Sequence, residues 1–370
     1  MRASFASFVF LLLANEADGK DAINWTFSSL KGDPTPHLDA NVGTPGQLVQ
    51  LKLTKWRDDF EFTVLGKAVG GKYDPTASST FFLISNDTEA KEVYGKETIM
   101  IADGVVETKK NIVVYEKNQT WSSQAGGLLP ICRVSADYQR DQLFIYELLK
   151  EFDRKEVVLS YDQMCYPGDS AFSSGVLTIG GRPADRCAAA WTSVATVPSE
   201  FDQWTFQMDG ISFGNHSVTG TWNATLEFGP ADIFLPQSVY NELDDALNVW
   251  DYLAPCNSSL QLVFNVGSYE IFLAAEEYLD QWNPTKGMCP LLVHPLDPRQ
   301  TLTLPPSVFK NHCVMFNYAN DMVGFAARIN QPPSACPTRP PASTPKGSER
   351  MTAASWLLSL IALLYTIVHF

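Results

Sequence analysis

Residues 42–62 read VGTPGQLVQLKLTKWRDDFEF. The segment opens with a Gly-Thr-Pro turn signal, continues as a strand-like run that ends at Leu53, and then becomes polar at Lys55. Its organisation is therefore a turn, a strand and a second turn. The strand-like run leads directly into that second turn, which makes the residues of the turn the first ones to examine.

Short apolar runs of the same kind recur along the chain. They are rich in Val, Ile, Phe and Tyr, and Gly, Asn, Asp and Pro separate them. The clearest runs are Val42–Leu53, Thr98–Ile101, Ile112–Tyr115, Val157–Tyr161, Gly175–Ile179, Trp204–Ile211, Gln261–Val266 and Val314–Phe316. Helical periodicity is best in Gln142–Phe152 and Ser238–Trp250. The sequence therefore predicts an all-β fold with a few short helices.

Length and charge narrow the class of protein. The chain has 370 residues, enough for one large core or for two domains. Its formal net charge of −14 argues against a nucleic-acid partner, because phosphate binding requires clustered Lys and Arg. No pair among the seven cysteines has metal-ligand spacing. We therefore expect neither a metal nor a cofactor, and we interpret the acidity as that of a soluble extracellular surface.

The N-terminus has the features of a secretory signal peptide. Met-Arg precedes an apolar run from Phe5 to Ala14, and polar residues follow at once. We expect residues 1–17 to be the signal peptide, with cleavage after Ala14 or Ala17.

The C-terminus carries a second apolar run, Trp356–Phe370, behind a segment rich in Pro, Ser and Thr. We interpret residues 329–353 as an extended stalk and residues 354–370 as a hydrophobic anchor signal. The run is shorter than the ~20 residues that span a bilayer comfortably. Small residues, a polar spacer and a terminal apolar tail are typical of a lipid-anchor (GPI) signal. A short transmembrane anchor, or neither, remain the alternatives.

Sequons and cysteines agree with secretion. The asparagines in N-glycosylation sequons are Asn24, Asn86, Asn118, Asn215, Asn223 and Asn257. Their number, behind a signal peptide, predicts a glycoprotein at the cell surface or outside the cell. Seven cysteines fit an oxidising compartment and indicate disulfides. Because the number is odd, one is left over, and Cys336 in the stalk is the strongest candidate.

Several short motifs stand in a fixed order along the chain. Tyr73–Phe81, YDPTASSTF, is the most specific of them, and it resembles the F-D-P-x-x-S-S-T-F segment of pepsin-like aspartic proteases (peptidase A1). Residues 43–47, GTPGQ, resemble the G-T-P-x-Q segment that leads into the first catalytic turn. Further similar segments are Ala125–Leu129, Gly175–Gly181, Trp204–Ile211, Val308–Phe309 and Asn320–Phe325.

The resemblance spans about residues 38–328. It implies a bilobal pepsin-like fold of two β-barrel-like lobes, residues 38–165 and 166–328, with a shared interdomain sheet. It also implies a disulfide pattern, in which a third pair remains once two are assigned. These pairs are Cys256–Cys289, Cys187–Cys313 and, as the remainder, Cys132–Cys165.

Active members of the family use two aspartates, one in each lobe, in Asp-Thr/Ser-Gly turns. The aspartates share a proton and a water, because two close carboxylates cannot both ionise cheaply. By register from the Gly-Thr-Pro motif, the first turn falls on Thr54, Lys55 and Trp56. A threonine thus replaces the aspartate, and a tryptophan replaces the glycine. Asp58 and Asp59 follow too late, and we interpret them as solvated loop charges.

The second turn is altered less. Glu227 stands at the aspartate position and Phe228 at the threonine, whereas Gly229 is kept. Lys55 and Glu227 either form an ion pair across the lobe interface or are solvated independently. Tyr94 stands where the family's flap begins, and it is either the retained flap side chain or an ordinary sheet tyrosine.

The resemblance and the altered turns together predict a catalytically inactive, surface-anchored glycoprotein. It would bind a peptide or protein in or near the former cleft, without nucleic acid and without a cofactor. One alternative is a residual or altered endopeptidase that uses Glu227. The other is a structural coat glycoprotein that has no specific partner.

Overall fold

The structure is a computed structural model. It describes residues 21–30, 33–55, 62–65, 73–89, 92–101, 105–115, 126–133, 144–165, 172–199, 203–229, 232–281, 284–296 and 301–329. All of them lie in Met1–Ser334, the first of two compact units. The second unit, Ala335–Phe370, lies outside the described residues, as do the predicted signal peptide, Trp56 and Asn118. No helix of the described part is long and apolar enough to cross a bilayer.

The strands of the first half of the chain are β1 (Ile23–Leu30), β2 (Asp33–Val42), β3 (Gln47–Thr54), β4 (Phe62–Leu65), β5 (Phe82–Asp87), β6 (Glu92–Ile101), β7 (Val105–Tyr115), β8 (Gly127–Pro130), β9 (Glu156–Cys165) and β10 (Phe172–Ile179). Those of the second half are β11 (Thr192–Ala195), β12 (Phe206–Phe213), β13 (His216–Leu226), β14 (Ile233–Pro236), β15 (Leu253–Pro255), β16 (Leu262–Val266), β17 (Tyr269–Leu273), β18 (Met288–Pro290), β19 (Val293–Leu296), β20 (Leu302–Leu304), β21 (His312–Asn317) and β22 (Met322–Ala327). The helices are α1 (Phe144–Leu149), α2 (Gln237–Leu247) and α3 (Val308–Asn311), with short 3₁₀ turns η3 (Pro75–Ala77) and η7 (Ala275–Glu277).

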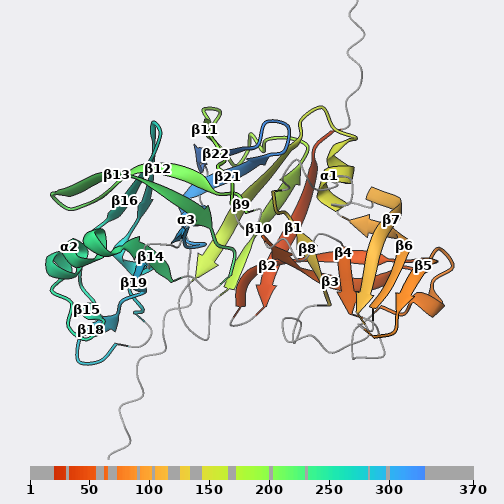
Figure 1. The fold of residues 1–370 in the computed structure, drawn as a ribbon, viewed down its shortest axis with the longest axis horizontal. Coiled ribbons are helices and arrows are strands. Elements are labelled where there is room, and N and C mark those ends of the chain that lie inside the picture. Colours follow the sequence, from red (N-terminus) through yellow and green to blue (C-terminus); the bar gives the residue numbers. More distant parts are fainter. Residues whose placement is uncertain are drawn as a thin grey trace, which may run out of the picture. The chain divides into compact units, whose positions relative to one another are not determined.

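The described strands form two large sheets and a small one (Figure 1). The larger sheet has the order β11-β22-β21-β9-β10-β1-β2-β3-β8-β4-β7-β6-β5, the second β17-β16-β12-β13-β20-β14-β19, and the small one β15-β18. Strand β9 pairs with β21, so strands from both halves of the chain share one sheet. The predicted all-β bilobal fold with a shared interdomain sheet is confirmed.

Local sequence explains most elements. In β6, buried and more exposed residues alternate along the whole strand, as a half-buried strand requires. The predicted segment 142–152 contains α1, and the predicted segment 238–250 overlaps α2, which begins one residue earlier. Helix α2 buries Val239, Leu243 and Leu247 on one face. The run predicted from Val42 is interrupted, because Gly43 adopts a φ of 86° and the strand resumes at Gln47. Strands β1 and β2 extend the sheet to the N-terminal side of the predicted lobe start at residue 38.

The two most specific motifs bind each other. The Gln47 side chain donates from Nε2 to the Asp74 carbonyl (2.9 Å) and accepts at Oε1 from the Asp74 N–H (2.8 Å). The Asp74 carboxylate in turn caps η3 by accepting from the Thr76 N–H (3.0 Å). The Thr44 carbonyl accepts from the Ser79 N–H (2.8 Å). These bonds hold the turn before β3 against the loop at residues 73–81, which is distant in sequence. They therefore fix the position of β3, the strand that ends at Thr54.

A buried carboxylate ties the same loop to β6. Glu97 is fully buried and accepts hydrogen bonds from the Tyr73 hydroxyl, from Thr80 Oγ1 (2.5 Å) and from the Thr98 N–H (2.7 Å). Burial, followed by the hydrogen bond to Glu97, raises the pKa of Tyr73 well above its usual range. Tyr73 therefore remains a donor at any physiological pH.

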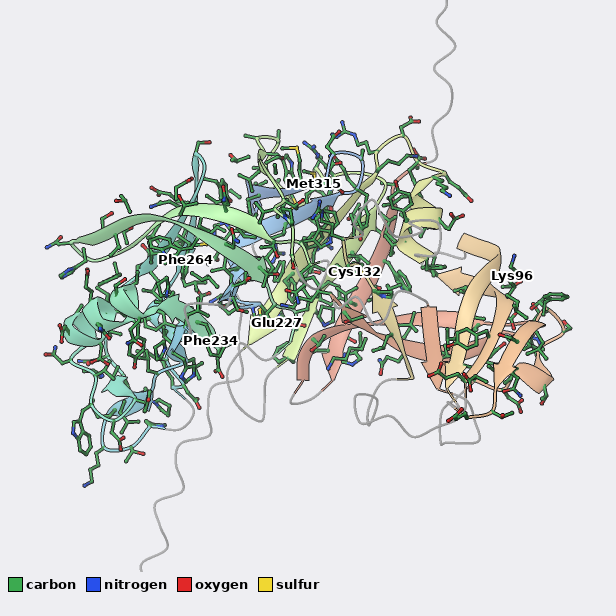
Figure 2. The ribbon with its side chains drawn as sticks, viewed as in Figure 1. Lys96, Cys132, Glu227, Phe234, Phe264 and Met315 are labelled. Carbon is green, nitrogen blue, oxygen red and sulfur yellow. A yellow bond between two sulfur atoms is a disulfide. The ribbon has the colours of Figure 1, made fainter. Side chains whose placement is uncertain are left out.

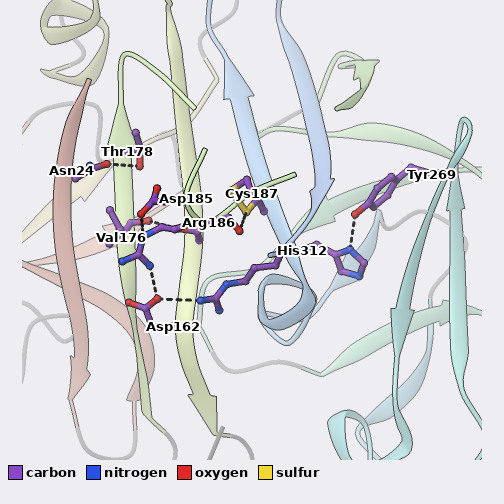
Figure 3. The surroundings of a disulfide bond; sticks show 12 residues. Asn24, Asp162, Val176, Thr178, Asp185, Arg186, Cys187, Tyr269 and His312 are labelled. Carbon is purple, nitrogen blue, oxygen red and sulfur yellow. Dashed lines mark hydrogen bonds and ion pairs between the residues drawn. A yellow bond between two sulfur atoms is a disulfide. The ribbon is translucent and has the colours of Figure 1, made fainter. Parts of the chain in front are cut away.

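Two predicted disulfides are present and the third is corrected. Cys187–Cys313 and Cys256–Cys289 are formed, and Figure 3 shows the surroundings of the first. Cys132 is buried and is not part of a disulfide, so the predicted Cys132–Cys165 pair is wrong. A bridge requires Cα atoms within about 7 Å. Cys132 follows β8, whereas Cys165 ends β9, and four strands separate β8 from β9 in the sheet order.

Candidate functional site

The two turns that the sequence singles out end equivalent strands in the two halves of the chain. Strand β3 pairs in parallel with β8, and the Thr54 carbonyl accepts from the Ile131 N–H (2.9 Å). Strand β13 pairs in parallel with β20, and the Glu227 N–H donates to the Leu304 carbonyl (2.9 Å). Both turns are therefore held at their bases by a parallel neighbour, which positions the side chains that follow each strand.

Lys55 and Glu227 form an ion pair between the two halves of the chain. Lys55 Nζ lies 2.9 Å from Glu227 Oε2, and the side chains are 5% and 23% exposed. Of the two alternatives left open by the sequence, the ion pair is the one observed. A buried ammonium requires such a partner, because moving it from water costs several kcal/mol when nothing compensates the charge.

The second carboxylate oxygen of Glu227 is also engaged. Glu227 Oε1 accepts from the backbone N–H of Phe228 (3.0 Å). One oxygen therefore faces a cation and the other faces a donor of its own turn. Thr54, at the position of the other acid, is buried at the end of β3. Its side chain is a neutral hydroxyl, so Thr54 and Glu227, the described residues at the two acid positions, supply one carboxylate between them.

Phe228 and Gly229 fix the second turn in place. Phe228 is buried and packs against Phe309 (ring centroids 5.8 Å apart) and Phe316 (6.1 Å). At Gly229, a Cβ atom would stand 3.3 Å from Thr35 Oγ1, which belongs to β2. Glycine is thus retained where a Cβ atom would come into tight contact with the N-terminal half. The phenylalanine replaces a polar brace by apolar packing.

Tyr161 on β9 is a neighbour of the site that the sequence did not indicate. It is fully buried, stacks on Phe309 (5.1 Å) and presents a hydroxyl with no hydrogen-bond partner within the described residues. Burial, and then the charge of Glu227, raise the pKa of Tyr161 well above its usual range. In the sequence Tyr161 is one more aromatic residue of a strand, and no signal distinguishes it.

The other predicted site residues divide into two groups. Trp56, Asp58 and Asp59 lie outside the described residues. Tyr94 lies inside β6, with β5 on one side and β7 on the other, and its hydroxyl donates to Glu92 Oε2 (2.5 Å). Figure 2 places Lys96, two residues further along β6, far from Glu227. Tyr94 is therefore a strand residue of the larger sheet, and its interpretation as the retained flap side chain stays a prediction.

The described residues contain no group of three or more His, Cys, Asp or Glu side chains arranged to hold a metal ion. Within the site, the available chemistry is that of an ion pair, a neutral threonine hydroxyl and a buried phenol. These groups offer an ion-paired surface and hydrogen bonding. Among the described residues at the two turns, Thr54 and Glu227 do not form a carboxylate pair that could share a proton.

Comparison with known proteins finds a matching family and a related protein. Residues 63–328 match the family described as eukaryotic aspartyl protease. The matched segment begins after the first altered turn and includes the second. The chain is also 24% identical over 249 residues to Rhizopuspepsin-4 from Rhizopus niveus. That match covers 62% of this chain and spans 62% of the length of Rhizopuspepsin-4.

Proposed function

The chain belongs to the eukaryotic aspartyl protease family, and from this premise we propose that it is a member in which peptide or protein binding has replaced hydrolysis. One observation carries the proposal: Lys55 Nζ lies 2.9 Å from Glu227 Oε2, at the meeting point of the two former catalytic turns. The ammonium group of Lys55 is therefore the partner of Glu227 at this point, where the family's mechanism requires a second carboxylate.

The chemistry supports this reading. In the family's mechanism, one carboxylate activates the water and the other, protonated, polarises the peptide carbonyl. Thr54 cannot ionise near neutrality, so it cannot take either part. Glu227 has both oxygens engaged by protein donors, and its extra methylene displaces the carboxylate from the aspartate position. Catalytic geometry tolerates little displacement.

The proposal includes a place in the cell. The protein is a secreted, glycosylated protein anchored to the cell surface by its C-terminal segment. Two disulfides fit an oxidising compartment. The described asparagines of the sequons are all exposed, as glycosylation requires: Asn24, Asn86, Asn215, Asn223 and Asn257.

A statine-type inhibitor tests the proposal at the site, because its hydroxyl mimics the water held between two aspartates. Calorimetric titration of the full chain at pH 4 and pH 7 should give no saturable binding, with an active pepsin-like protease as the positive control. Stoichiometric binding that Glu227→Gln abolishes would contradict the proposed loss of hydrolysis.

A capture experiment tests the second part of the proposal, the binding of a peptide or protein. The full chain is immobilised beside a Lys55→Glu variant, which places two carboxylates together and repels them. A peptide or protein partner that uses the former cleft should be retained by the wild type and lost with the variant. Equal retention on both surfaces would move the binding site away from the Lys55–Glu227 pair.

A further inference from the structure

Strand β5 is an apolar edge that faces solvent. It is the terminal strand of the larger sheet, and in the described part it pairs with β6 alone. All six of its residues are exposed, and three of them are large and apolar. Their exposed fractions are 67% for Phe82, 54% for Leu83 and 53% for Ile84. An edge of this kind exposes unpaired N–H and C=O groups beside apolar side chains, and such edges pair readily with other chains.

The usual protections of an edge strand are few in β5. Its sequence, FLISND, contains no Lys, Arg or Pro, which are the common residues that discourage pairing. One irregularity is present, a register shift between Leu83 and Ser85. Three consecutive apolar residues remain exposed in spite of it, so a further protection is expected.

Asn86, on the same strand, is a candidate for this further protection. It is the acceptor residue of the sequon Asn86-Asp87-Thr88, and its side chain is exposed. In the sheet register Asn86 stands opposite Val93 and Leu83 stands opposite Gly95. Val93 and Gly95 are two residues apart on β6, so Asn86 and Leu83 lie on the same face, about 7 Å apart. A glycan on Asn86 would therefore begin on the face of β5 that carries Leu83.

We propose that Asn86 carries an N-linked glycan whose role is to cover the apolar edge of β5 and to prevent a second copy of the chain from pairing with it. A branched, hydrated oligosaccharide at this position obstructs an incoming strand, which would have to lie about 4.8 Å from β5. A lipid-linked oligosaccharide is the glycan donor. In this transfer the bond between the oligosaccharide and the diphosphate of its lipid carrier breaks, and a bond to the Asn86 amide nitrogen forms. The lipid diphosphate is the leaving group, and the amide nitrogen loses one proton. The proposal requires passage through the secretory pathway but does not depend on the loss of hydrolysis.

The edge and the former catalytic turns can be tested separately. Phe82 pairs with Lys96, and Figure 2 shows Lys96 far from Glu227. Substitutions on β5 therefore leave the Lys55–Glu227 contact intact. A defect in the edge variants changes the mass of the protein in solution, whereas a defect at the ion pair changes the coupling energy between Lys55 and Glu227, so the two are distinguishable.

The experiment compares the full chain, expressed in mammalian cells, with four variants. Asn86→Gln and Thr88→Ala remove the sequon. Thr88→Ser keeps it and is the matched control. Asn257→Gln removes a different exposed sequon and controls for the general loss of a glycan. Peptide mapping after glycosidase treatment determines whether Asn86 is modified, and light scattering after size exclusion gives the mass of the protein over a range of concentrations.

We expect Asn86 to be modified in the wild type and in Thr88→Ser, and both to remain monomeric. Asn86→Gln and Thr88→Ala should shift toward dimers and larger species as concentration rises, whereas Asn257→Gln should not. Adding Ile84→Lys to Asn86→Gln should restore the monomer, because a lysine on the edge discourages pairing. Where a variant fails to be secreted, enzymatic deglycosylation of the folded wild type should produce the same shift.

Three results would overturn the proposal. The first is an unmodified Asn86 in the wild type. The second is a monomer mass for Asn86→Gln and Thr88→Ala at every concentration at which Thr88→Ser is monomeric. The third is equal self-association in Asn257→Gln, which would mean that any lost glycan lowers solubility.

Discussion

Lys55 buries an ammonium group at the end of a strand, an arrangement that costs free energy unless a carboxylate compensates it. Glu227 supplies that carboxylate from the other half of the chain, at 2.9 Å. The two side chains are therefore coupled, because removal of either one leaves the other charge without its partner between the two halves of the chain.

Removal of the ammonium should destabilise the fold. We predict that Lys55→Met lowers the free energy of unfolding by about 2–4 kcal/mol, somewhat less than for a fully buried pair because Glu227 is 23% exposed. Adding Glu227→Gln should recover part of the loss, with a coupling energy of at least about 1 kcal/mol. Urea unfolding monitored by fluorescence measures all four corners of this cycle.

Lys52→Met on the same strand is the control, since Lys52 is half-buried there, and it should cost less than about 1 kcal/mol. Additive effects of the two substitutions at Lys55 and Glu227 would mean that the ion pair does not form in solution.

The positions of these residues were predictable, but the contact between them was not. Counting from the Gly-Thr-Pro motif locates Thr54 and Lys55, because Gln47 and Asp74 hold the start of β3 in a fixed register. Whether Lys55 reaches Glu227 depends on how the lobes pack, which no local pattern encodes. The same holds for Tyr161, which becomes a site residue only when β9 is placed in the shared sheet.

Among the elements, strands were predicted better than connections. The alternation of Ile23, Trp25 and Phe27 with exposed polar residues marks β1, yet the resemblance begins only near residue 38 and the strand was not included. The Cys132–Cys165 pair failed for a related reason. The two cysteines were paired because they were left over, and that reasoning says nothing about the distance between them. Strands β8 and β9 are far apart in the sheet order.

The Cys256–Cys289 bridge should make a measurable contribution to stability. It closes a loop with a sequence separation of 33 residues, for which the chain-entropy model gives roughly 3–4 kcal/mol. We predict that the double variant Cys256→Ser/Cys289→Ser loses about that much free energy of unfolding. Peptide mapping without reduction should recover the Cys256–Cys289 pair from the wild type. Recovery of Cys256 joined to another cysteine would contradict the register of the C-terminal half.

His312, at the start of β21, makes the same half of the molecule sensitive to acid. Its ring is buried, its Nδ1 lies 2.8 Å from the Tyr269 hydroxyl (Figure 3), and burial lowers its pKa from 6.5 to about 4. As pH falls, the unfolded chain takes up this proton first. The contribution of His312 to stability is therefore complete above pH 6.5 and is lost between about pH 6.5 and pH 4.

We predict that acidification from pH 7 to pH 4 costs the wild type up to about 3 kcal/mol more free energy of unfolding than it costs His312→Asn. Asparagine keeps a polar atom near the position of Nδ1 and does not titrate. Urea titrations of both proteins at the two pH values give the difference. Equal pH dependence in the two proteins would show that His312 does not titrate with the fold.

For the whole molecule, the fold class followed from motifs in a fixed order, while the proposed anchoring rests on the C-terminal segment, which lies outside the described residues. If a lipid replaces residues 354–370, as proposed, phosphatidylinositol-specific phospholipase C should release the protein from intact cells. Flow cytometry before and after treatment measures the release. Retention on the cells, with the terminal apolar segment still detected by an antibody, would favour a transmembrane anchor.

The central claim is that the two former catalytic turns no longer hydrolyse peptides, and an assay of peptide hydrolysis by the purified full chain tests it most directly. Wild type, Glu227→Gln and an active pepsin-like protease are incubated with a library of quenched fluorescent peptides from pH 3 to pH 7. We predict that wild type and Glu227→Gln both stay at background at every pH, because one carboxylate paired with Lys55 cannot hold and activate the water. Hydrolysis by the wild type that Glu227→Gln abolishes would contradict the account.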